Sequence, residues 1–113
     1  MTFQISYGHF DTETEALAEA AQLGLSPVTV DFEAENSDLH WHDFASRVYV
    51  TDGNVRIETV DGQTCELHRG DMIEADARVV HREITRGYRA VIGFAADPTS
   101  LSRPINKDPA ELS

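Results

Sequence analysis

Apolar and polar residues alternate along most of the chain from residue 28 to residue 95, the two-residue period of strands with one buried face. The pattern predicts strands over about residues 28–32, 47–51, 55–60, 64–68, 72–75, 79–84 and 88–95. The segments between them carry turn signals, namely Asp52-Gly53, Asp61-Gly62, Arg69-Gly70-Asp71 and Arg86-Gly87. Many short strands without intervening helices predict an all-β sandwich or barrel.

Two further elements are predicted before this region. Residues 3–7 alternate like a short strand, and Thr12 with Glu15 forms a T-x-x-E capping box that predicts a helix start. The helix is expected over residues 13–23 and is ended by Gly24. Its apolar stripe is narrow and rich in alanine, so it is expected to lie flat on another element.

The length of 113 residues predicts a single domain over residues 1–113. Within it we expect a helical N-terminal extension over about residues 12–24, a barrel over about 27–96 and an extended tail over 97–113. The tail carries three prolines and few apolar residues, so it is expected to fray or to drape over a neighbouring element.

The net negative charge of the chain disfavours some classes of binding partner. The chain has 20 acidic against 9 basic residues and a formal net charge of −11. Such a surface repels phosphate backbones and anionic lipids, so we expect no nucleic-acid partner and no membrane association. No apolar run approaches the roughly 20 residues of a membrane span, the first ten residues lack the features of a signal peptide, and the lone Cys65 has no internal disulfide partner. The expected location is the cytoplasm.

Candidate chemistry lies in the five histidines. His40 and His42 are one residue apart, and residues i and i+2 of a strand point to the same face. Two imidazoles side by side suit one shared cation, although a chance surface pair is the alternative. Trp41 then points outward, and we expect the helix or a second subunit to cover it.

Two spaced motifs strengthen the metal hypothesis. The first is His40-Trp41-His42 followed by Ser46 and Gly53, and the second is Gly70-Asp71 followed by Asp76, Arg78 and His81. Over roughly residues 27–96 the sequence resembles a small single-domain cupin. The resemblance implies a cupin-type jelly-roll barrel of two antiparallel sheets. It also implies that His40, His42 and His81 point inward and share one divalent transition metal.

The motifs depart from the usual cupin pattern. The usual glutamate ligand of the first motif is replaced by Ser46, or by Arg47 with the longer spacing, and the Pro and Gly of the second by Asp76 and Arg78. The expected site therefore has three histidines and no obvious protein carboxylate. Neutral imidazole suits Fe, Mn, Ni, Cu and Zn alike, so the ligands do not name the metal. The alternative is that the histidines line a pocket without metal.

Three more residues are candidates for the substrate pocket. Arg47 and Tyr49 share a face, and if that face is interior they could hold an anionic group. In the opposite phase, Ser46 and Val48 line the pocket instead. Glu74 could supply the missing carboxylate or a general base, with a solvated surface position as the alternative.

These features predict a metal-dependent enzyme acting on a small polar organic molecule, such as a dioxygenase or an isomerase. The alternatives are a non-catalytic module that binds or senses a small molecule, and a metal-free protein with a structural role. Open sheet edges and the outward Trp41 predict a homodimer.

Overall fold

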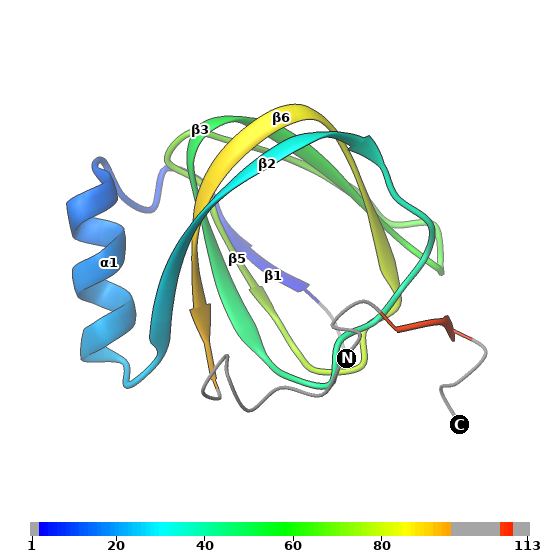
Figure 1. The fold of residues 1–113 in the computed structure, drawn as a ribbon, viewed down its shortest axis with the longest axis horizontal. Coiled ribbons are helices and arrows are strands. Elements are labelled where there is room, and N and C mark those ends of the chain that lie inside the picture. The colour runs from blue at the N-terminus through cyan, green and yellow to red at the C-terminus, as the bar shows by residue number, and fades with distance from the viewer. Residues whose placement is uncertain (1–2, 96–106, 110–113) are drawn as a thin grey trace.

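The computed structural model describes residues 3–95 and 107–109. These form β1 (Phe3–Ser6), α1 (Glu13–Gln22), β2 (Ser26–Asn36), β3 (Ser46–Thr59), β4 (Thr64–His68), β5 (Met72–Ala75) and β6 (His81–Phe94). All pairings are antiparallel in the order β1-β5-β3-β6-β2, with β4 beside β3. Figure 1 shows this sheet curled into a barrel with α1 lying outside it. The predicted all-β cupin-type barrel with one short N-terminal helix is therefore confirmed.

Strand β3 is longer than the sequence pattern predicted. The Asp52-Gly53 pair does not turn the chain, because β3 continues through it while paired with β6, with register shifts at Val50/Asp52 and Gly53/Arg56. Gly53 has φ +73°, and a Cβ atom there would lie 2.6 Å from the carbonyl oxygen of Gly87. The predicted hairpin at this point is wrong, and the glycine forms an irregularity that bends a continuous strand.

The same correction applies to Arg86-Gly87, which lies inside β6. The long strands β3 and β6 connect the two faces of the barrel, since β3 pairs with β5 near its start and with β4 near its end. The two sheets implied by the resemblance are thus hydrogen-bonded into one curled sheet. The predicted turn at Asp61-Gly62 is present between β3 and β4.

Helix α1 forms as its capping residues predict. The Thr12 hydroxyl accepts a hydrogen bond from the backbone N–H of Glu15, and the Glu15 carboxylate accepts one from the Thr12 N–H. Gly24 follows the helix with φ +76°. The buried face of the helix, Ala16 and Ala20, packs with Tyr49, Met72 and Val91 on the outer surface of the barrel. A second apolar cluster fills the barrel from β3, β4, β5 and β6.

Trp41 is covered by residues of the tail and not by α1. Its backbone pairs with that of Lys107, and its indole N–H donates to the carbonyl oxygen of Asp108 at 2.9 Å. The side chain is consequently 8% exposed. The prediction that the helix covers Trp41 is therefore corrected. Residues 107–109 lie over this tryptophan, in agreement with the expectation that the tail drapes over a neighbouring element. The remainder of the predicted tail lies outside the described residues.

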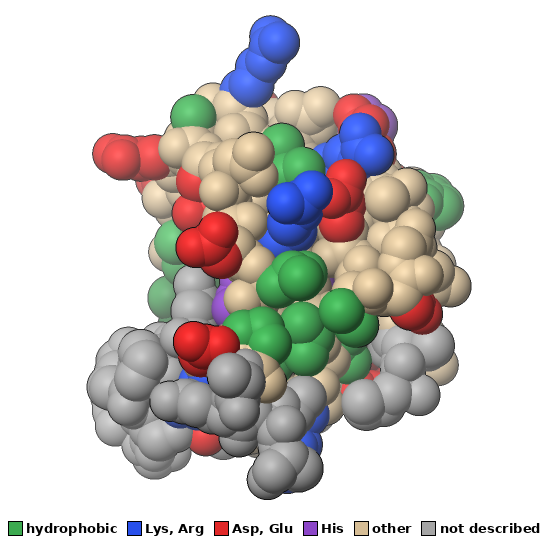
Figure 2. Space-filling view, turned by 90° about the vertical axis from the view of Figure 1, so that its right-hand side faces the viewer, with side chains coloured by type: hydrophobic (Ala, Val, Ile, Leu, Met, Phe, Trp, Pro, Cys, Tyr) green, Lys and Arg blue, Asp and Glu red, His purple; other side chains and the backbone are tan. Residues whose placement is uncertain are grey.

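The surface mixes charges of both signs. On the face shown in Figure 2, basic side chains stand next to acidic ones around an apolar patch. Among the ion pairs of the described residues, Arg82 contacts Glu58, and Arg89 contacts both Glu13 and Asp31 at 2.8 Å. In the part of the chain that the structure describes, α1 is the one helix, and it is too short to cross a membrane.

Candidate metal centre

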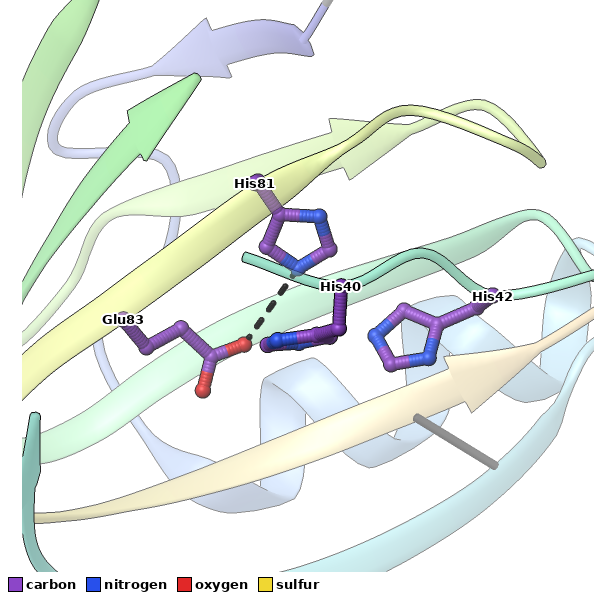
Figure 3. Close-up of side chains that lie close together, drawn as sticks. All are labelled: His40, His42, His81 and Glu83. Atoms are coloured by element: carbon purple, nitrogen blue, oxygen red, sulfur yellow. Dashed lines mark ion pairs between the residues drawn. The ribbon is translucent and has the colours of Figure 1, made fainter. Parts of the chain in front are cut away.

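The three predicted histidines lie side by side inside the barrel. His40 and His42 belong to the segment between β2 and β3, and His81 is the first residue of β6. The backbones of His40 and His81 exchange two hydrogen bonds of 2.8 and 2.9 Å, which joins the two segments. The ring centroid of His40 lies 4.5 Å from that of His81 and 5.0 Å from that of His42 (Figure 3).

A fourth residue, Glu83, completes the cluster and was missed in the sequence. One donor atom from each of His40, His42, His81 and Glu83 lies within 4.8 Å of all the others. Glu83 follows His81 by two residues on β6, so both side chains point to the same face, and the Glu83 carboxylate is 3.5 Å from His81 Nε2. The spacing rule that pairs His40 with His42 could have found it.

Hydrogen bonds to the backbone orient two of the imidazoles. The Nδ1 atom of His40 is 2.8 Å from the carbonyl oxygen of Asp38, and that of His81 is 2.9 Å from the carbonyl oxygen of Val79. A carbonyl oxygen only accepts, so each Nδ1 carries the proton. In a neutral ring the Nε2 lone pair is then free to bind a cation, which is how metal-ligating histidines are commonly held.

The dimensions of the cluster also fit one ion. Imidazole and carboxylate ligands lie about 2.0–2.2 Å from a transition metal, so two ligand atoms of one ion are separated by up to about 4.2 Å. The observed limit of 4.8 Å is slightly larger, and side-chain movements of a few tenths of an ångström would close it. His40 and His81 are both 6% exposed, which keeps two of the donors away from bulk water.

The electrostatics of the cluster favour an ionised carboxylate. Burial would raise the pKa of Glu83, but when the imidazoles are protonated and no metal is bound, the hydrogen bond from His81 Nε2 and the charges of His81, His40 and His42 outweigh it and lower this pKa below its ordinary value. Glu35, on β2, shows the opposite balance, because burial and the nearby Glu83 raise its pKa while His40 partly opposes them. The two carboxylates thus share one side of the site.

Arg78 holds the His42 segment from the other side. It occupies the place of the usual motif glycine and adopts φ +69°, a conformation that is uncommon for a residue with a side chain. Its backbone N–H donates to the carbonyl oxygen of His42 at 2.7 Å, and its guanidinium lies 5.8 Å from the ring centroid of Trp41. The substitution of arginine for glycine therefore adds a contact to the segment that carries two histidines.

His42, His81 and Glu83 border a cavity of about 340 Å³. Its walls are mostly apolar and come from β1, β2, β3, β5 and β6, including Phe32, Val48 and Ile92. Ser46 and Val48 face this space, which supports the alternative in which these two residues, rather than Arg47 and Tyr49, line the pocket.

Arg47, Tyr49 and Glu74 lie away from this cavity, beneath α1. The Tyr49 hydroxyl donates to Glu19 at 2.7 Å, and Arg47 forms an ion pair with Glu74 at 2.9 Å. Arg47 also lies 3.4 Å from Glu19. The structure thus groups these three residues with the helix, on the face of β3 and β5 opposite the histidines, because strand residues alternate between the two faces.

Comparison with known proteins places the fold. A DUF861 family protein from Thermotoga maritima matches with a TM-score of 0.62 and 17% identity, covering 82% of this chain and 99% of that chain. Ectoine synthase from P. lautus matches with a TM-score of 0.56 and 27% identity, covering 65% of this chain and 54% of that chain. Acireductone dioxygenase from Bacillus anthracis, with a cadmium ion in its active centre, gives 0.58 and 18%, covering 74% and 63%.

This chain thus spans about half of the ectoine synthase and less than two thirds of the dioxygenase. No curated protein matches the sequence. The family model for the cupin domain matches residues 28–92, which is more than half of the chain. The chain belongs to the cupin family.

Proposed function

We propose that this cupin binds one divalent transition metal through His40, His42, His81 and Glu83 and acts on a small organic molecule that chelates the metal inside the barrel. The reaction class that fits is dioxygenation or isomerisation. The observation that carries the proposal is the convergence of four donor atoms within 4.8 Å, two of them on imidazoles whose tautomer the backbone selects.

The number of protein ligands bears on the metal. Four ligands would complete a tetrahedral zinc ion, whereas a metal that takes five or six ligands keeps positions open for a substrate. The donor set therefore favours Fe, Mn or Ni over Zn as the active metal. When bound, such an ion would supply Lewis acidity to the oxygen of a chelating substrate. The apolar walls would keep water away from the bound molecule.

The relatives support this reading by analogy, since one is a dioxygenase that holds a metal ion in its active centre. Fold alone does not assign a reaction.

A titration with metal tests the binding site directly. Tag-free protein stripped of metal is titrated by calorimetry with Mn²⁺, Ni²⁺, Zn²⁺ and, without oxygen, Fe²⁺. We expect one site per chain. His42→Ala should weaken binding by more than the roughly 10- to 100-fold cost of losing an outer-shell partner. His68→Ala is the control, because its side chain is 60% exposed on β4. Binding that His42→Ala leaves unchanged would contradict the proposal.

Turnover distinguishes an enzyme from a binding module. Iron-loaded protein is tested for oxygen uptake with thiols, diketones and phenolic acids. Metal-dependent consumption of oxygen or of substrate supports the enzyme. Equal ligand binding by metal-free and metal-loaded protein, without turnover, supports the non-catalytic alternative.

A further inference from the structure

The residues that line the cavity indicate which kind of molecule can bind next to the metal centre. Most of the residues that line it are aliphatic or aromatic. Its volume of about 340 Å³ lies at the small end of the range for ligand sites, roughly 300–1,000 Å³. At about 30 Å³ per water-sized group, this space suits a ligand with on the order of ten non-hydrogen atoms.

The charged side chains that line the cavity are all acidic apart from the histidines. Among the described residues that line it, none is a lysine or an arginine, and two are glutamates, Glu35 and Glu83. Arg47, which lies between the lining residues Ser46 and Val48, is paired with Glu74 and Glu19 outside the barrel. A divalent ion bound beside one carboxylate keeps a single positive charge, so one anionic head group can be balanced there. A second anion on the ligand would meet apolar walls and Glu35.

We infer that the ligand of this site is a small chelator with one metal-binding head and an uncharged, apolar body, and that molecules with a second anionic group, such as dicarboxylates and phosphate esters, are excluded. The inference rests on the proposed function, because the head group needs the metal. It deepens that function by naming the part of the ligand that the barrel, rather than the metal, selects.

Matched hydroxamates test this selection by calorimetry, using protein as isolated or loaded with one equivalent of Ni²⁺, which keeps coordination positions open beside four protein ligands, and with its metal content measured on the same sample. All the probes share one chelating head. Benzohydroxamate should bind about tenfold or more tightly than acetohydroxamate, because its ring is buried against the walls. The neutral 4-nitrobenzohydroxamate should bind at least tenfold more tightly than 4-carboxybenzohydroxamate, which has nearly the same size and one more negative charge.

Variants locate the selection in the cavity. Val48→Phe narrows the space and should weaken benzohydroxamate binding at least tenfold while the metal content is unchanged. Val60→Phe is the control for added bulk, because Val60 is 67% exposed and is not among the lining residues. Glu35→Gln removes a negative charge and should reduce the discrimination between the nitro and carboxy probes.

The possible failures are distinguishable. Metal-loaded protein that binds the carboxy probe as tightly as the nitro probe, or that binds acetohydroxamate as tightly as benzohydroxamate, would overturn this inference and leave the metal site standing. Protein that takes up no metal would overturn the proposed function, and this inference with it.

Discussion

Glu83 supplies the negative charge of the proposed metal centre, and its side chain is 18% exposed. Glu83→Gln keeps the shape of the side chain and removes that charge. We expect metal affinity, measured by calorimetric titration, to fall by at least about tenfold, by analogy with the loss of partners around metal sites. The variant should fold normally.

Glu66→Gln is the matched control for Glu83→Gln. Glu66 lies on β4 with its side chain 53% exposed, and the same chemical change there should leave metal affinity unaltered. Equal affinities of the wild-type protein and Glu83→Gln would remove Glu83 from the ligand set.

Tyr49 has a structural role beneath α1. Burial, and then the hydrogen bond to Glu19, raise its pKa from 10.0 to about 12. Because the folded-state pKa is above the unfolded value, the contribution of Tyr49 to stability is complete below about pH 10 and is lost as the pH rises from about 10 to about 12. Tyr49→Phe should lower the free energy of unfolding at pH 7 by about 1–3 kcal/mol, since the buried hydroxyl bonds a carboxylate.

Urea denaturation at pH 7, 9, 10.5 and 11 measures both effects. The wild-type protein should lose more stability than Tyr49→Phe over the alkaline part of the range. An identical alkaline loss in the two proteins would show that other groups cause it.

At the scale of elements, local patterns predicted some features well. The capping box predicted α1, and the two-residue period predicted a β-rich fold, because both depend on neighbours in the sequence. An Asp-Gly pair, in contrast, signals a local bend, and only the distant partner β6 decides that Gly53 bends a continuous strand instead of closing a hairpin.

The site residues divide in the same way. The three histidines could be identified from spacing. Glu83 lies outside both cupin motifs, so their spacing points to Ser46 or Arg47 at the ligand position and not to Glu83. The sequence does not show which residues of β3 face the barrel interior. The segment between His42 and Ser46 is irregular, so the alternation of faces at His40 and His42 cannot be extended to β3. Arg47 and Tyr49 therefore had two possible faces until the pairing with β5 and β6 was known.

Residues 107–109 contact Trp41 and thereby support the segment that carries His40 and His42. Trp41→Phe keeps an aromatic ring but deletes the indole N–H that donates to Asp108. We expect the free energy of unfolding to fall by about 1 kcal/mol and metal affinity to weaken several-fold. Urea denaturation and metal titration measure the two quantities.

Lys107→Ala is the control for Trp41→Phe, because it keeps the two backbone hydrogen bonds between residues 41 and 107. A variant Trp41→Phe with unchanged stability and unchanged metal affinity would show that this contact does not support the site.

For the whole molecule, a homodimer stays a prediction. The covering of Trp41 by residues 107–109 removes one reason for it. The other reason remains, because within residues 3–95 and 107–109 no strand pairs with the outer edges of β1 and β2. Light scattering at micromolar concentration should give twice the 12.6 kDa mass of one chain. A mass of one chain would contradict the prediction.

In the proposed function, the barrel brings together one metal site from two segments that are distant in the sequence. Elemental analysis by plasma mass spectrometry of native protein that has never carried an affinity tag tests it most directly, beside a His40→Ala/His42→Ala variant. We predict close to one transition-metal ion per chain in the native protein and its loss in the variant. Fewer than about one ion per ten chains in the native protein, or the same metal content in both proteins, would contradict the claim.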